Sequence, residues 1–359
     1  MVEFSYFFLF ALGLAALVKG SRWLVGSAIW AAEVFRIPQH IIGATIVSIC
    51  TTLPETFVSS AAALKNEASM AAGSALGSIG VNMGLLLSVL ILSYGPKISN
   101  RKDFFKHVGF LLLLLALLWG AGFFIGEITR SMALILVLLL LLYIVGNVYF
   151  AARLMDLDIQ YDIVYDREGF QHYDPHTNMP EGKVYDEKEN DFDISFQVLL
   201  KKCFFFCLGV FLVVLGSNLM VDNGIRIAEF YQKPHYVISI VFISIGTSLP
   251  ELTTVLTAVR KGAPTLGVSN VIGASILNIL QVLGIASLLN PLSPFNERNL
   301  LSFQLPMLFL MALSLALFGF LSRQRISKWC GVLLLFLYIV TIIINLFWEF
   351  APIPGLNLF

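Results

Sequence analysis

The sequence predicts an all-α polytopic membrane protein with ten transmembrane helices in two inverted-topology repeats of five helices each. Three observations lead to this fold class. The 359 residues are 58% hydrophobic and only 13% charged, with a mean hydropathy of +0.84, which is far more apolar than an ordinary soluble domain. Ten apolar runs are each long enough to cross a bilayer. The chain also repeats itself at a fixed offset of 196 residues.

The ten apolar runs, separated by charged residues, give the predicted spans. A helix needs about 20 apolar residues to cross the hydrocarbon core. Helices rather than barrel strands are expected, because stretches such as Leu111–Leu118 and Leu134–Leu142 are apolar on all sides, whereas barrel strands alternate polar and apolar residues. The spans are expected at 4–35, 38–63, 69–94, 107–126, 131–151, 203–230, 235–259, 264–290, 302–322 and 329–349.

The charges predict the orientation of the chain. The 23 basic and 23 acidic residues cancel, so nucleic acid is not an expected partner and the lipid bilayer is. With both termini outside, sixteen Lys and Arg flank the spans on the cytoplasmic side and five on the other. Because cytoplasmic loops are enriched in basic residues, we expect an integral protein of the cell membrane (plasma or inner membrane) with both termini outside.

One polar stretch divides the chain into a first five-helix repeat (1–152), an acidic cytoplasmic loop (153–200) and a second five-helix repeat (201–359). From Arg153 to Ser195 there are twelve Asp or Glu against four Lys or Arg. The composition is typical of a solvated linker. A cation-sensing segment built on Asp156, Asp158 and Asp162 is the alternative, although the stretch lacks the glycine turn and closing Glu of an EF-hand loop.

The internal repeat needs no gap over some sixty residues. Because five is an odd number, the second copy is expected to enter the membrane from the opposite side, and inverted repeats of secondary transporters place their substrate near the bilayer midplane. The matching positions include Gly20-Ser21 with Gly216-Ser217, Thr51 with Thr247, Leu53-Pro54-Glu55 with Leu249-Pro250-Glu251, Gly77 with Gly273 and Asn82 with Asn278.

Each copy carries one carboxylate in the middle of its second span, Glu55 and Glu251. A charge at the bilayer centre costs about 2.5–3.5 kcal/mol or more, so such residues usually mark an ion path. In the first copy Ser48, Thr51 and Glu55 share one helix face, and Ser244, Thr247 and Glu251 do so in the second. A polar face on each of two helices therefore predicts a joint site.

The residues around the two glutamates extend the predicted site. Pro54 and Pro250 lack the N–H that would bind the carbonyl four residues back, so backbone oxygens are expected to be free there. In the partner span, Ser78 and Asn82 lie four residues apart on one face, and its small residues allow helices to approach closely.

Oxygen ligands without convergent His or Cys describe a hard-cation site that suits Ca2+ and can also take Na+. Protons could neutralise the glutamates when no metal is bound, so the site permits exchange by competition. The four cysteines lack zinc-type spacing, and the chain has no GxxxxGK[ST], GxSxG or HExxH motif. Neither an enzyme nor a cofactor is therefore expected.

At these residues the chain resembles the sodium/calcium exchanger branch of the cation/Ca2+ exchanger superfamily, which has two "alpha repeats". The resemblance rests on Thr51-Thr52-Leu53-Pro54-Glu55 and Thr247-Ser248-Leu249-Pro250-Glu251 with the glycine, serine and asparagine positions of the following spans. It implies a diamond of sites made by segments two, three, seven and eight, and a gate formed by segments one and six. The implied ligands are Glu55, Glu251, the side chains of Thr51, Thr52, Ser78, Asn82, Thr247, Ser248 and Asn278, and the carbonyls of Ser48 and Ser244.

Three departures from the family pattern bear on the counter-ion. Cys50 stands where the second copy has Gly246, and Ile79 stands where an Asn is common in the family. Ala274 stands where the family has a serine, so one Na+ ligand is missing unless Ser275 turns inward. Asn278 stands where several relatives have Asp, which argues against a K+ requirement. The resemblance implies exchange of Ca2+ for Na+. Ca2+/H+ exchange on the same fold is the close alternative, and a channel or a sensor is the alternative from another class.

One charge inside a predicted span is not explained by the site. Arg22 lies within span one, and Asp222 lies on span six one turn beyond Asn218, the repeat counterpart of Arg22. An unpaired cation at this depth is costly. Arg22 is expected either to reach toward the interface along its helix or to pair with Asp222 and tie the two spans together.

Overall fold

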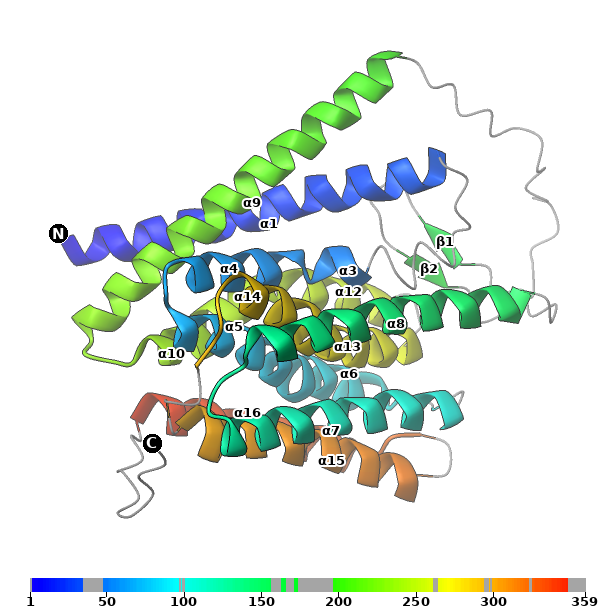
Figure 1. Ribbon diagram of the computed structural model, residues 1–359. Helices are drawn as coiled ribbons and strands as arrows, with labels where there is room; N and C mark the ends of the chain where they lie inside the picture. Colours follow the sequence, from blue (N-terminus) through cyan, green and yellow to red (C-terminus); the bar gives the residue numbers. More distant parts are fainter. Residues whose placement is uncertain are drawn as a thin grey trace.

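The computed structural model is almost entirely helical and confirms the polytopic all-α fold (Figure 1). It describes residues 2–34, 48–96, 98, 101–155, 163–165, 171–173, 196–260, 264–293, 297, 299–322 and 325–347. Its helices fall into ten segments in the order of the predicted spans. Residues 38–47 at the start of predicted span two, and most of the 153–200 loop, lie outside the described residues.

The first half contains segments one to five. These are α1 (Val2–Val34); α3 (Ser48–Thr51) with α4 (Leu53–Leu64); α5 (Ala68–Gly80) with the π-helical turn η2 (Val81–Leu86) and α6 (Leu87–Tyr94); α7 (Arg101–Phe124); and α8 (Arg130–Met155). Within the polar stretch, β1 (Ile163–Tyr165) pairs antiparallel with β2 (Gln171–Tyr173).

The second half contains segments six to ten. These are α9 (Phe196–Phe230); α10 (His235–Ile238), η3 (Ser239–Ile243), α11 (Ser244–Thr247) and α12 (Leu249–Arg260); α13 (Pro264–Leu277), η4 (Asn278–Leu283) and α14 (Gly284–Leu289); η6 (Leu300–Gln304) with α15 (Leu305–Leu321); and α16 (Lys328–Phe347). Since α8 ends at Met155 and α9 begins at Phe196, both helices extend into the predicted 153–200 loop.

Eight of the segments are continuous helices long and apolar enough to cross a membrane. The other two, segments two and seven, are interrupted at Thr52 and Ser248, two residues before Pro54 and Pro250. A proline within a helix removes one backbone hydrogen bond and its ring clashes with the preceding turn. Interrupted helices at membrane depth are tolerated where the irregular backbone is buried in protein.

Segments three and eight form the centre of the molecule. The spans Ala68–Tyr94 and Gly267–Leu289 are each 83% buried, against 11% for Arg130–Tyr149 and for Val198–Phe230. Glycines let the two halves approach closely here: a Cβ added to Gly77 would lie 2.8 Å from the Ile240 Cα, so α5 packs directly on η3. Figure 1 shows α1 and α9 crossing one side of this centre, and α7, α15 and α16 lying on the other.

Helices α1 and α9 run antiparallel in close contact. The start of α1 meets the end of α9 through the rings of Phe7 and Tyr231, whose centroids are 6.2 Å apart. The end of α1 meets the start of α9, where the Ser27 hydroxyl donates to the Lys202 carbonyl over 3.3 Å. Because these helices are repeat counterparts, their antiparallel course shows that the two halves enter the membrane from opposite faces.

Polar contacts define these two faces. On the first, called the Lys65 face, the Lys65 ammonium lies 2.6 Å from the Asp222 carboxylate, His235 Nδ1 lies 2.6 Å from Glu67 Oε2, and Ile128 and Leu292 pair through their backbones. On the second, called the Arg101 face, Arg101 donates to the Ser322 carbonyl over 2.8 Å. Apart from Asp222, which lies within α9, the residues in these contacts lie in loops or at helix ends that the predicted spans place on the same side.

The predicted pairing of Arg22 with Asp222 is wrong, because the ion-pair partner of Asp222 is Lys65. The antiparallel register brings Gly13 against Gly216 and Gly20 against Gly209. The same register places Arg22 near the Arg101 face and Asp222 opposite Phe7, about 22 Å away along α1. Because the two repeats cross the membrane in opposite directions, a position near the end of α1 and its counterpart near the end of α9 lie toward opposite faces of the molecule. Repeat counterparts such as these therefore do not meet.

Candidate cation site

The two helix breaks place four hydroxyl residues at the centre of the molecule. Thr51 ends α3 and Thr247 ends α11. Thr52 (φ −88°, ψ 3°) and Ser248 (φ −82°, ψ 9°) form the breaks themselves. The new helix resumes at once in both copies, since Thr56 N–H donates to the Thr52 carbonyl over 3.1 Å and Leu252 N–H to the Ser248 carbonyl over 3.0 Å. All four hydroxyl residues are buried.

Glu55 and Glu251 occupy the first turns of α4 and α12. The amino-terminal turn of a helix carries a partial positive charge that favours a carboxylate. Each glutamate is only 1% exposed. The halves meet at this point, because the Ser248 hydroxyl donates to Glu55 Oε1 over 3.3 Å.

Segment three adds a hydroxyl contact from the first half to the second. The hydroxyl oxygens of Ser78 and Thr247 lie 3.4 Å apart, so this contact is with segment seven, whereas the shared face of Ser78 and Asn82 was expected to meet segment two. The Ser244 carbonyl, an implied ligand, accepts the Ser248 N–H over 3.1 Å and the Thr247 hydroxyl over 3.3 Å. It is therefore not left free by the break. Ser48 begins α3, but its side chain lies outside the described residues.

Asn82 and Asn278 lie in the π-helical turns of segments three and eight, η2 and η4. Such turns are frequent at functional sites because they change the direction in which side chains point. Both asparagines are buried, and the Oδ1 of each has no hydrogen-bond partner among the described residues. The repeat thus presents one amide oxygen from each half.

Among the described residues of the predicted site, five buried oxygen atoms from the two halves lack a hydrogen-bond partner: Glu55 Oε2, both carboxylate oxygens of Glu251, Asn82 Oδ1 and Asn278 Oδ1. Leaving buried polar atoms unpaired is costly. All five are acceptors, and oxygen acceptors are the ligands of hard cations. The described residues hold no cluster of three or more His, Cys, Asp and Glu, so the donor set is mixed: two carboxylates with amides and hydroxyls.

Gln281 is a polar neighbour of the site that the sequence analysis missed. It is 2% exposed and reaches from η4 to the break in segment two. Its Oε1 accepts the Thr52 hydroxyl over 3.2 Å, and its Nε2 donates to the Thr56 hydroxyl over 3.0 Å and to the Ile49 carbonyl over 3.4 Å. Its position, three residues after Asn278 in an otherwise apolar run, was the available signal.

The missing serine at Ala274 is not replaced by its neighbour. Ser78, the repeat counterpart of Ala274, contacts Thr247, whereas Ala274 has no hydroxyl to offer. The hydroxyl of Ser275 donates to the Val271 carbonyl of its own helix over 2.9 Å. The two halves are therefore unequal: the first break is held by Gln281, and the second contacts Ser78.

Comparisons with known proteins agree with this architecture. The profile of the family described as "Sodium/calcium exchanger protein" matches residues 5–149 and 201–347. The sodium/calcium exchanger MaX1 of Methanosarcina acetivorans is 30% identical over 366 residues, which cover 94% of this chain and 97% of that protein. The inner membrane protein YrbG of Escherichia coli is 31% identical over 285 residues, 79% of each chain. A structure of the sodium-calcium exchanger NCX_Mj soaked with Na+ and Sr2+ superposes with a TM-score of 0.57 at 26% identity, covering 95% of this chain and 98% of the other. The chain belongs to the sodium/calcium exchanger protein family.

Proposed function

We propose that this protein is a secondary active antiporter that exchanges Ca2+ for Na+ across a cell membrane. The observation that carries the proposal is the set of five unpaired, buried oxygen atoms contributed by both halves. The names of MaX1 and of NCX_Mj as sodium/calcium exchangers support it. The protein would move ions without converting them chemically, so it is not an enzyme and needs no cofactor.

The proposed ligands are the predicted set. Glu55 and Glu251 would hold Ca2+ directly. The side chains of Thr51, Thr52, Ser78, Asn82, Thr247, Ser248 and Asn278, with the carbonyls of Ser48 and Ser244, would complete the Ca2+ and Na+ sites. To bind a cation, the Ser244 carbonyl would give up hydrogen bonds that it accepts from Ser248 and Thr247. Two carboxylates balance the charge of one Ca2+, and Na+ ions can balance the same charge. Because both cations require the same glutamates, one must leave before the other binds, and this competition couples the two fluxes.

The proposed orientation follows from the basic residues. The Arg101 face carries the excess of Lys and Arg, so it would face the cytoplasm. Both termini would then lie outside, and the acidic 153–200 loop would be cytoplasmic. Since the two halves enter from opposite faces, their shared site is reachable in turn from either side, as alternating access requires.

Ion flux in reconstituted vesicles tests the proposed exchange. Vesicles loaded with Na+ and diluted into Na+-free medium should take up radioactive Ca2+, while vesicles with a pH gradient and no Na+ should take up little. Uptake driven by the pH gradient alone would assign the protein to Ca2+/H+ exchange. Voltage-driven uptake without any counter-gradient would instead indicate a channel.

A further inference from the structure

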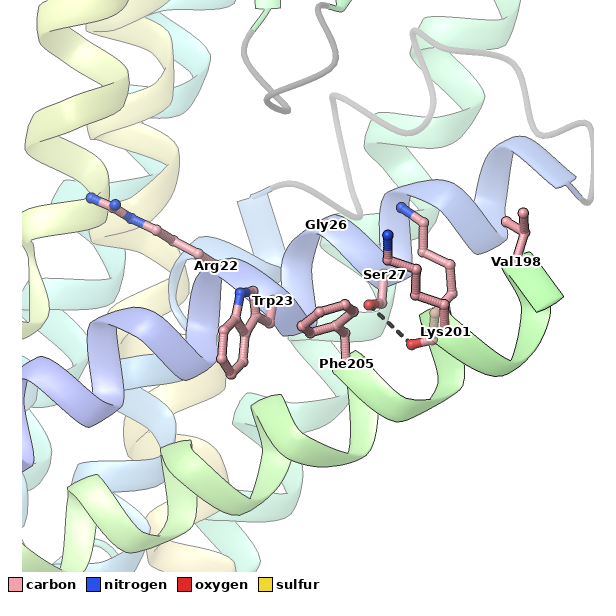
Figure 2. A pocket seen from close by; sticks show the side chains of 8 residues that line it. Arg22, Trp23, Gly26, Ser27, Val198, Lys201 and Phe205 are labelled. Atoms are coloured by element: carbon pink, nitrogen blue, oxygen red, sulfur yellow. Dashed lines mark hydrogen bonds between the residues drawn. The ribbon is translucent and has the colours of Figure 1, made fainter.

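A cleft of about 360 Å³ lies between the Arg101-face ends of α1 and α9 (Figure 2). Its walls include Trp23, Gly26 and Ser27 of α1 and Lys201, Lys202 and Phe205 of α9. The helices touch through Gly20 and Gly209, whereas a Cβ on Gly26 would meet nothing within 4 Å. The cleft therefore begins where the glycine contact ends.

The walls of the cleft are mostly apolar, but three basic and two aromatic residues line it. No Asp or Glu occurs between residues 19 and 32 or between 196 and 221, while these stretches hold Lys19, Arg22, Lys201 and Lys202. The rings of Trp23 and Phe205 lie 5.2 Å apart between the helices. Figure 2 shows Lys201 reaching from α9 toward α1, while Arg22 points away from Phe205. Of the other lysines nearby, Lys202 Nζ lies 5.7 Å from the centroid of the Trp30 ring, and Lys19 Nζ lies 5.3 Å from that of the Trp23 ring.

The depth of the cleft matches that of lipid headgroups. The apolar part of segment one runs from Phe4 to Ala28, and that of segment six begins at Val198. The cleft lies where both end, which is the boundary between hydrocarbon and water. Phe204, level with the cleft, and Phe211, two turns closer to the membrane centre, are 61% and 60% exposed and offer an apolar surface for acyl chains.

We propose that this cleft binds the phosphate group of an anionic glycerophospholipid. The ammonium groups of Lys201 and Lys202 would hold the phosphate, Trp23 and Phe205 would pack against the glycerol region, and the acyl chains would follow α9. With the proposed orientation this is the cytoplasmic leaflet, where anionic lipids attract basic segments. The bound lipid would join α1 to α9 at the end where their glycine contact is lost.

Retention of lipid by the full-length protein tests the proposal. Protein from mixed phosphatidylglycerol and phosphatidylcholine bilayers is partly stripped with detergent, and the lipids that stay bound are counted by native mass spectrometry. The wild type should retain phosphatidylglycerol in preference to phosphatidylcholine. The variant Lys201→Gln with Lys202→Gln should retain it roughly tenfold to thirtyfold less, because each lysine near the surface contributes to anionic-lipid binding.

Two further variants test whether lipid retention depends on the cleft itself or on the general positive charge of the surface. Lys102→Gln with Lys328→Gln removes two exposed cations from the Arg101 face outside the cleft, and should leave retention within about twofold of wild type. Gly26→Phe fills the cleft without changing charge and should lower retention, with thermal unfolding as the check that it folds. Equal retention by the Lys201/Lys202 variant, or an equal loss in the Lys102/Lys328 control, overturns the proposal.

The same assay tests whether the cleft binds the phosphate of a lipid or a soluble phosphate ion. Inorganic phosphate should not displace the lipid, since it lacks acyl chains. Displacement by millimolar phosphate would mean that the cleft takes soluble phosphate and would overturn the lipid assignment. Replacement of residues 160–192 by a Gly/Ser tether should leave retention unchanged. A gain in retention would mean that the acidic segment, and not lipid, occupies the cleft of the intact chain.

Discussion

Glu55 and Glu251 are the residues on which the proposed exchange depends. Glutamine keeps their shape but removes the charge, so Glu55→Gln or Glu251→Gln leaves one carboxylate against the two charges of Ca2+. Each variant should lower Na+-driven Ca2+ uptake by roughly 100-fold or more, as expected when one member of a buried charge set is removed. The control is Glu127→Gln, which changes an exposed glutamate on the Lys65 face and should transport normally. Uptake at the wild-type rate by either variant would contradict the proposal that Glu55 and Glu251 bind Ca2+.

Gln281 should change the affinity of the site for Na+ without being a cation ligand itself. Gln281→Met keeps a side chain of similar length but removes the hydrogen bonds to Thr52, Thr56 and Ile49. Because Thr52 is a proposed Na+ ligand, the Na+ concentration for half-maximal exchange should rise roughly tenfold, the usual effect of losing a residue that orients a ligand. The maximal rate should change less. The control is Leu85→Met, at the repeat counterpart of Gln281; an equal shift in both variants would mean a packing effect.

The contrast between these residues shows what a sequence can reveal. A carboxylate inside an apolar span is conspicuous because its burial is so costly, and Glu55 and Glu251 stand out for that reason. Gln281 is a neutral amide in an apolar run, and its partner Thr52 lies 229 residues away. Nothing local to Gln281 indicates that contact. The spacing also could not show whether Ser275 turns inward, because that depends on its rotamer; in the structure its hydroxyl bonds to its own helix instead.

At the scale of the elements, a feature could be predicted where a residue or the repeat itself constrains the backbone directly. Pro54 and Pro250 indicated disturbed helices, and the structure interrupts both segments two residues earlier. The repeat offset and the odd number of spans indicated opposed halves. The ion pair of Asp222 was not predictable in the same way, because it depends on the register in which α1 and α9 cross. That register is determined by glycine contacts between residues far apart in the chain.

The glycine contact between α1 and α9 should tolerate no added methyl group. A Cβ on Gly216 would lie 2.6 Å from the Gly13 carbonyl oxygen and from the Leu17 backbone nitrogen. Gly216→Ala should therefore destabilise the protein by about 1–3 kcal/mol, the usual cost of overpacking. The matched control is Gly109→Ala on α7, where an added Cβ meets nothing within 4 Å. This control should be neutral or stabilising by about 0.5–1 kcal/mol. Thermal unfolding in lipid nanodiscs measures the stability of both variants. A melting temperature that falls in Gly109→Ala but not in Gly216→Ala would contradict the close contact of α1 with α9 at Gly216.

The ion pair between Lys65 and Asp222 ties α9 to the turn between α4 and α5. The two side chains are 29% and 52% exposed, so their coupling should be modest, about 0.2–1 kcal/mol. A double-mutant cycle with Lys65→Ala and Asp222→Ala should measure it as a change in unfolding free energy. The cycle of Arg22→Ala with Asp222→Ala is the control and should show no coupling. If only the second cycle showed coupling, Asp222 would pair with Arg22 and not with Lys65.

At the scale of the whole molecule, the inverted halves explain why one site can serve two faces. Glu55 and Glu251 belong to segments that cross in opposite directions, and their hydroxyl and amide neighbours come from both halves. Segments three and eight bury most of their surface around this point, whereas α1 and α9 keep much of theirs exposed. Rearranging the outer pair costs fewer buried contacts than rearranging the centre, so alternating access is expected to move α1 and α9 across a nearly fixed site.

The sidedness of the molecule can be tested independently of transport. If the Arg101 face is cytoplasmic, Glu127→Cys on the Lys65 face should react with a membrane-impermeant maleimide in intact cells, whereas Arg325→Cys should react only after permeabilisation. Both positions are exposed. Cys203 and Cys207, which are also exposed, are first replaced by alanine, while Cys50 and Cys330 are buried and can stay. The reverse labelling pattern would place the acidic loop outside the cell. It would overturn the orientation inferred from basic residues but leave the inverted fold intact, because the fold rests on the antiparallel contact of α1 with α9 and not on charge.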